Sequence, residues 1–144
     1  MKAVAVDYGE VRMGLAGTDA LGMLAHPVET VAGRPWPEAA RRIAEVVGER
    51  GAEVVVMGLP VRMDGTEGTA AEKVRRFAEE LARHLAAGVR IEYQDEYGST
   101  LEAAADLRAS GRKARRHRPV IDQAAAVVIL RDWLEARRVR EGLE

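Results

Sequence analysis

The stretch Lys2-Ala3-Val4-Ala5-Val6-Asp7, followed directly by Tyr8-Gly9, decides the fold of this chain. Its apolar residues predict a buried strand, and the glycine lets the chain turn at once into a second strand. A carboxylate at the point where a buried strand meets a tight turn costs several kcal/mol unless a cation or hydrogen-bond donors compensate it. Asp7 is therefore the first candidate ligand for a metal ion.

Composition excludes several classes of protein. A chain of 144 residues with 47% apolar content can bury one substantial core, so we expect a single domain over residues 1–144. The sequence shows neither a run of about 20 apolar residues nor a secretory signal, which predicts a cytoplasmic protein without membrane contact. The absence of cysteine excludes thiolate sites and favours Mg²⁺ or Mn²⁺ on oxygen ligands over zinc. The net charge of −1 means that any nucleic-acid contact needs a local basic patch.

Hydrophobic periodicity alternates between the strand and helix patterns along the chain. Two sequence pairs, Thr69 with Glu72 and Ser99 with Glu102, predict capping boxes at the starts of helices. Pro119 predicts the start of the final helix, which should run to about Arg138. The expected strands cover residues 2–7, 11–16, 23–31, 54–57 and 89–93; the expected helices cover 36–50 and 69–87 and begin again at 99 and 119, with a loop over 58–68.

This order of elements predicts an α/β fold. Three hairpin-connected strands followed by strand and helix alternation indicate a five-stranded mixed sheet with helices on both faces and the first strand at its centre. The carboxyl ends of parallel strands gather at one edge of such a sheet, where ligands usually bind. Asp7 and the pair Asp95-Glu96 should therefore lie on the same edge. Strand alternation places Glu96 on the polar face with Glu92, which favours Glu96 as the ligand, although Asp95 remains an alternative.

Asp122 is expected to point inward from the final helix. Helical spacing aligns it with Ala126, Ile129 and Trp133, the apolar stripe that must face the sheet. An acid in an early turn can also simply complement the helix dipole, but a position on the apolar stripe favours the inward interpretation. Converging carboxylates repel one another unless a divalent cation keeps them ionised. Asp7, Glu96 and Asp122 together predict a two-metal site for attack on a phosphodiester.

Five short motifs stand in the order and spacing of one known family, and the resemblance runs from the first strand to about Leu134, nearly the whole chain. The sequence resembles the YqgF family, also called the RuvX or pre-16S ribosomal RNA nuclease family. The motifs are Val6-Asp7-Tyr8-Gly9, Met57-Gly58-Leu59-Pro60, Met63-Asp64-Gly65-Thr66-Glu67-Gly68, Asp95-Glu96 and Val120-Ile121-Asp122-Gln123-Ala124-Ala125.

The resemblance implies a ribonuclease H-like fold and a metal-dependent nuclease. Its implied role is trimming of the 5′ end of pre-16S ribosomal RNA, with resolution of Holliday junctions as the alternative. Tyr97 stands where the family usually has arginine, so a charged donor is missing beside the acids. Two other interpretations have less support: half of an actin-like ATPase, because Asp7-Tyr8-Gly9 resembles a phosphate loop, and a binding module without catalysis.

A basic run precedes Asp122 and supplies the missing patch. It holds no acid between Asp106 and Asp122, and it could deliver a phosphate backbone to the metal site. The alternative is a solvated charge run. One domain with one such patch suits a single RNA strand and a monomer, whereas junction resolution requires paired sites in a dimer. The residues expected to bind nucleic acid are Arg112, Lys113, Arg115, Arg116 and Arg118.

Neutralising Arg115 and Arg116 together should weaken nucleic-acid binding for all sequences alike. Each lost phosphate contact reduces the slope of log affinity against log salt concentration by about 0.7 for single strands. Fluorescence anisotropy over a salt series measures that slope for the double variant and the wild type. An unchanged slope would show that the run is only a solvated surface.

Overall fold

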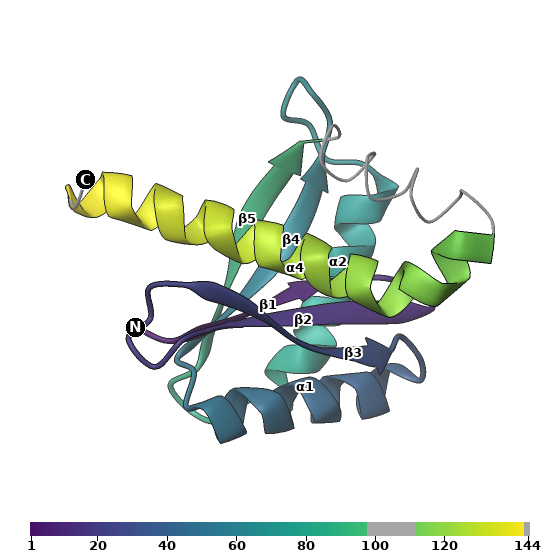
Figure 1. Cartoon of the computed structure of the whole chain (residues 1–144), viewed down its shortest axis with the longest axis horizontal. Coiled ribbons are helices and arrows are strands. Elements are labelled where there is room, and N and C mark those ends of the chain that lie inside the picture. Colours follow the sequence, from purple (N-terminus) through teal and green to yellow (C-terminus); the bar gives the residue numbers. More distant parts are fainter. Residues whose placement is uncertain (98–111, 143–144) are drawn as a thin grey trace.

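The computed structural model describes residues 1–97 and 112–142, the side chains of residues 112–121 excepted. Its core is a five-stranded sheet in the order β3-β2-β1-β4-β5 (Figure 1). β1 pairs with β2 and β2 with β3 in antiparallel fashion, whereas β1 with β4 and β4 with β5 are parallel. The predicted mixed sheet with a central first strand is therefore confirmed. The strands are β1 (Ala3–Asp7), β2 (Arg12–Thr18), β3 (Ala25–Ala32), β4 (Val54–Val61) and β5 (Arg90–Tyr97).

Helices cover both faces of the sheet, as the sequence predicts. α1 (Trp36–Arg50) and α2 (Thr69–Ala82) lie on one face, and the long α4 (Arg112–Glu141) crosses the other (Figure 1). Alternate residues of β1 pack into two hydrophobic cores. Val4 and Val6 lie in the core beneath α1 and α2, and Ala3 and Ala5 lie in the core beneath α4. This double coverage explains why the central strands read as continuous apolar runs.

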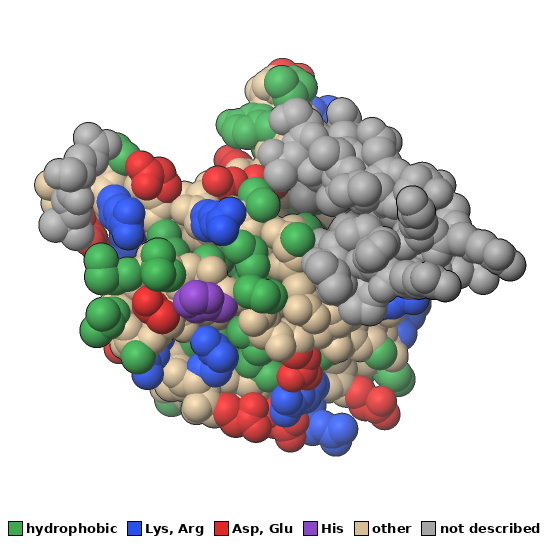
Figure 2. All heavy atoms as spheres, in the orientation of Figure 1, with side chains coloured by type: hydrophobic (Ala, Val, Ile, Leu, Met, Phe, Trp, Pro, Cys, Tyr) green, Lys and Arg blue, Asp and Glu red, His purple; other side chains and the backbone are tan. Residues whose placement is uncertain are grey.

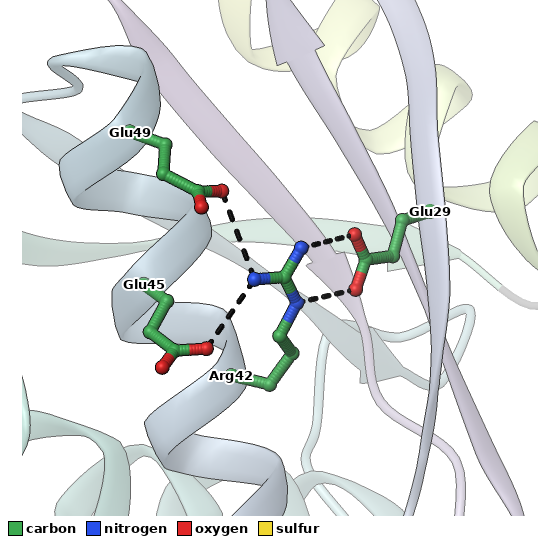
Figure 3. A network of polar contacts seen from close by, with 4 residues as sticks. All are labelled: Glu29, Arg42, Glu45 and Glu49. Carbon is green, nitrogen blue, oxygen red and sulfur yellow. Dashed lines mark hydrogen bonds and ion pairs between the residues drawn. The ribbon is translucent and has the colours of Figure 1, made fainter.

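A polar network ties α1 to the edge strand β3 (Figure 3). Arg42 donates through Nε and Nη2 to the two carboxylate oxygens of Glu29, both at 2.7 Å. Its Nη1 donates to Glu45 at 3.3 Å and lies 3.7 Å from Glu49. The guanidinium keeps the pKa of Glu29 below its ordinary value. The bidentate geometry holds α1 against β3 in a defined orientation. Because the side chains are partly exposed, the ion pairs add little to the free energy of unfolding.

The prediction of a loop over residues 58–68 is wrong for the first of these residues, because β4 continues to Val61. Pro60 lies within the strand, opposite Glu96 of β5. β1 pairs with β4 only as far as Met57, so at Pro60 the strand has a neighbour on one side only. A proline without an N–H is tolerated at such an edge position. β5 is also longer than predicted: it ends at Tyr97 rather than Tyr93 and pairs with β4 over this extension.

The expected cap and end of α2 and the expected start of α4 also differ from the structure. α2 has Gly68 rather than Thr69 at its N-cap, and none of the described side chains caps it, so the first capping box is absent. α2 ends at Ala82 rather than near Gly88. α4 begins at Arg112 instead of Pro119, because the arginine, lysine and alanine residues before the proline are strong helix formers. The second expected capping box, at Ser99, lies outside the described residues.

Close packing of α4 on β2 predicts a strong effect of Gly14→Ala. A Cβ at Gly14 would lie 1.9 Å from the backbone oxygen of Asp122, so α4 would have to move. We expect the free energy of unfolding to fall by about 1–3 kcal/mol or more. Gly48→Ala in α1 is the matched control, because nothing lies within 4 Å of its Cβ position. That variant should gain about 0.5–1 kcal/mol in chemical denaturation. Equal stabilities of the two variants would contradict the tight contact.

Candidate active site

Asp7 and Glu96 lie in the same pocket at the carboxyl edge of the parallel strands. The pocket has a volume of about 550 Å³. Asp7 is the last residue of β1, and Glu96 is the last residue but one of β5. The prediction that the two strand ends share one edge is therefore confirmed. The described residues that line the pocket are Asp7, Tyr8, Gly9, Glu10, Gly58, Pro60, Thr69, Ala70, Lys73, Val74, Glu96 and Ile129.

Glu96 is the most unusual group in this pocket. The residue is only 4% exposed, and its Oε1 atom has no hydrogen-bond partner among the described residues. Burial raises the pKa of Glu96 to about 8, and a hydrogen bond with Asp132 together with the charges of Asp132, Asp7 and Asp95 adds to the shift. Each of these causes disfavours the ionised form. A divalent cation in the pocket would reverse this preference, because it attracts the carboxylate that the neighbouring acids repel.

Asp95 and Glu96 have different environments, as strand alternation predicts. The side chains of Ile91 and Tyr93 pack toward the α1–α2 core, and Asp95, two residues further on, is exposed at the end of the strand. Glu92 is on the other face, where its carboxylate accepts a hydrogen bond of 3.0 Å from Trp133 of α4. Glu96, four residues after Glu92, faces α4 in the same way and lines the pocket. Burial and position therefore favour Glu96 over Asp95 as a ligand.

Asp122 is buried on α4, at 6% exposure, in agreement with the inward position predicted from helical spacing. Its backbone lies against Gly14, which is paired with Asp7 across β1 and β2. Among the described residues that line the pocket, however, α4 contributes Ile129 rather than Asp122. No three His, Cys, Asp or Glu residues within the described ranges are grouped as a metal site. A shared site of Asp7, Glu96 and Asp122 thus remains a prediction.

Tyr8 connects the pocket to the hydrophobic core. Its ring packs on Phe77 of α2 at a centroid distance of 5.5 Å and edge-on to Trp36 of α1 at 6.3 Å. The tyrosine follows Asp7 directly, so this packing fixes the turn that carries the carboxylate. The hydroxyl of Tyr8 is buried and has no hydrogen-bond partner among the described residues.

Sequence reasoning missed two interactions of residues that line the pocket. Asp132 reaches Glu96 from α4, although it is exposed and lies beside the apolar stripe rather than on it. Lys73 of α2 forms an ion pair with Glu10, which also lines the pocket. Neither pairing has a local signal, because the partners lie 36 and 63 positions apart along the chain.

The predicted nucleic-acid-binding residues lie at the start of α4, and their side chains are outside the described residues. On the face shown in Figure 2, the coloured acidic and basic side chains are interspersed rather than separated. That face therefore offers no continuous basic surface among the residues described. No described helix is both long and apolar enough to cross a membrane.

Comparisons with known proteins agree on the family and the fold. The family described as "RuvX: Holliday junction resolvase" matches residues 1–136. A protein of Streptomyces avermitilis named "Putative pre-16S rRNA nuclease" is 51% identical, over 99% of this chain and 94% of its own length. A protein of Streptomyces coelicolor with the same name is 50% identical, over 99% of this chain and 88% of its own length.

Two solved structures share the ribonuclease H-like fold at low sequence identity. Thermus thermophilus RuvC in complex with a Holliday junction has a TM-score of 0.53 and 18% identity, and the match covers 99% of this chain and 96% of RuvC. The fowlpox virus resolvase with its junction DNA has a TM-score of 0.56 and 13% identity, over 94% and 98% of the two chains. The match over residues 1–136 and the relatives at about 50% identity show that this chain belongs to the RuvX family.

Proposed function

We propose that the chain is a divalent-metal-dependent nuclease that processes the 5′ end of pre-16S ribosomal RNA in the cytoplasm. Relatives at 50–51% identity, matched over 99% of the chain, carry the name of that activity. The observation that carries the proposal is Glu96, a buried acid that shares a pocket with Asp7 and has one carboxylate oxygen without a partner among residues 1–97 and 122–142. A nuclease needs such a site, because charge must be placed beside the scissile phosphate.

The residues fit Mg²⁺ or Mn²⁺, which prefer carboxylate oxygens. Asp7 and Glu96 would hold the cation, and Asp122 would join them from α4. When bound, the ion neutralises charge on the phosphate and activates a water molecule. Asp95 is the alternative ligand to Glu96, and it would need a change in the end of β5 to enter the pocket.

The surrounding groups act on the two acids in different ways. The carboxyl group of Asp132 hydrogen-bonds with Glu96 only while one of the two is protonated, so a bound cation would have to displace that proton. The packing of Tyr8 on Phe77 holds the backbone that carries Asp7. Tyr97 is 46% exposed and stands where the family motif usually has arginine. Because tyrosine carries no positive charge, another residue must supply the cationic contact to the substrate.

Holliday junction resolution is the second candidate, favoured by the description of the family and by the junction complexes among proteins of this fold. Junction cleavage requires two symmetric cuts and therefore a dimer with paired sites. Hydrolysis of a single RNA strand requires one site, which this pocket provides. We therefore favour RNA as the substrate and a monomer as the active form.

Asp7→Asn should lower hydrolysis by orders of magnitude while the fold persists, because the amide keeps the shape of the side chain and removes its charge. Cleavage of a labelled 16S precursor RNA with Mg²⁺ or Mn²⁺, and its loss in EDTA, measures the effect. Asp19→Asn is the matched control: Asp19 accepts a hydrogen bond of 2.8 Å from the Met23 N–H in the β2–β3 loop, and it does not line the pocket.

The same assay distinguishes the two substrates when a four-way DNA junction is included. Preferential cleavage of the RNA by a monomer is the expected result. Paired nicks in the junction made by a stable dimer, with RNA left intact, would establish the resolvase function instead. Full activity of Asp7→Asn, or of the wild type in excess EDTA, would contradict metal catalysis at this pocket.

Glu96→Gln should stabilise the metal-free protein, because it replaces a buried carboxylate with a neutral side chain of the same shape. The pKa of about 8 in the folded state lies above the ordinary value of 4.5, so the folded protein binds this proton more tightly than the unfolded chain. Ionisation therefore destabilises the wild type increasingly between about pH 4.5 and about pH 8. The variant's advantage should be small at the lower pH and reach a few kcal/mol at the higher one.

Denaturation in EDTA at both pH values measures this difference. Asp19→Asn again serves as the control, because Asp19 does not line the pocket and is not among the charges that shift the pKa of Glu96. Added Mg²⁺ should stabilise the wild type more than Glu96→Gln, since only the wild type keeps the carboxylate that holds the ion. Identical pH profiles of wild type and Glu96→Gln would show that the carboxylate is not desolvated.

A further inference from the structure

The pocket that contains Asp7 and Glu96 has a second wall of opposite character. The first turns of α2 supply it, through Thr69, Ala70 and Lys73. Among the described residues that line the pocket, Lys73 carries the only positive charge. The acids at the strand ends suit a cation, whereas this wall suits an anion.

The start of α2 adds to the attraction for an anion. The helix has glycine at its N-cap, and no described side chain accepts hydrogen bonds from its first N–H groups. Such N–H groups and the helix dipole favour a phosphate. A separate observation indicates a ligand in this pocket: Glu96 lines the same space, is 4% exposed, and has no hydrogen-bond partner for its Oε1 within the part of the chain that the structure describes.

Lys73 already holds an anion in the free protein. Its ammonium group forms an ion pair with the carboxylate of Glu10, which lies in the β1–β2 loop on the same pocket. This contact keeps the pKa of Glu10 below its ordinary value, so the carboxylate is ionised at neutral pH. Both side chains are 48% exposed, and a phosphate from solution can therefore reach the lysine.

The other cations of α2 are engaged away from the pocket. Arg75 forms two hydrogen bonds of 2.7 Å with Glu67 and lies over the ring of Tyr93. Arg76 pairs with Glu72, one turn earlier on the same helix, at 2.6 Å. Lys73 differs from both, because its partner Glu10 lines the pocket, whereas Glu67 and Glu72 do not.

We propose that Lys73 and the first turn of α2 bind a phosphate group of the substrate strand, next to the phosphate group that is cleaved. This inference rests on the proposed function. In the free protein, the carboxylate of Glu10 occupies the position of that neighbouring phosphate. The exchange of a carboxylate for a phosphate leaves Lys73 paired in both states. Glu10 therefore weakens non-productive anion binding, and a strand that also reaches Asp7 and Glu96 displaces it. The recognised chemistry is a phosphodiester oxygen, common to RNA and DNA.

Binding of a short fluorescein-labelled oligouridylate in EDTA tests this proposal without cleavage. Lys73→Gln should weaken binding severalfold and reduce the slope of log affinity against log salt by about 0.7, the value for one phosphate contact. Glu10→Gln should strengthen binding, because Lys73 then has no competing carboxylate. This gain should shrink in the double variant, since the two residues act through one ion pair.

Arg76→Gln and Glu72→Gln are matched controls from the neighbouring ion pair, and both should leave affinity and slope nearly unchanged. Thermal unfolding should show that all variants remain folded, because the substituted side chains are exposed. If Lys73→Gln behaves like Arg76→Gln, or if the effect of Glu10→Gln persists in full without Lys73, the inference is overturned.

The outcome is independent of catalysis. Active cleavage of RNA combined with an unchanged salt slope in Lys73→Gln would leave the proposed function intact and remove the phosphate site. The expected binding changes in a protein that cleaves neither RNA nor junctions would support the phosphate site and refute the nuclease function.

Discussion

Burial of the central strands on both faces is the constraint on which the rest of the structure depends. β1 and β4 contribute alternate side chains to the two hydrophobic clusters, so neither strand has a face that can carry a charged group. Polar chemistry is therefore confined to the ends of the strands. Parallel pairing of β1, β4 and β5 then brings their carboxyl ends to one edge, where Asp7 and Glu96 share a pocket.

The same edge concentrates electrostatic strain. Glu96 is desolvated and lies near Asp132, Asp7 and Asp95, an arrangement that favours its neutral form. A protein selected for stability alone would not keep at this position a buried acid whose Oε1 has no partner in the described part of the chain. A cation in the pocket would relieve this strain, because the neighbouring carboxylates that raise the pKa of Glu96 also attract positive charge.

Close contacts between backbones determine how the helices complete the pocket. α4 lies so near β2 that only glycine fits at position 14, and this contact sets the position of Asp122. Further along α4, Ile129 lines the pocket and Trp133 hydrogen-bonds with Glu92. On the other face, the aromatic contacts of Tyr8 join β1 to α1 and α2, so the acidic and basic walls are held by one core.

The sequence by itself determined the strand order, the double-sided sheet, the shared edge of Asp7 and Glu96, and the inward position of Asp122. Each of these depends on periodicity and burial, which are local properties of the chain. Only the tertiary structure decided that β4 continues through Pro60, that α4 starts before Pro119, and that Lys73 pairs with Glu10 and Asp132 with Glu96. β4 can contain Pro60 because its pairing with β1 ends at Met57, so no hydrogen bond to β1 is lost at the proline. The two side-chain pairs join elements that are distant in sequence. Such contacts depend on how the elements dock, which no local pattern records.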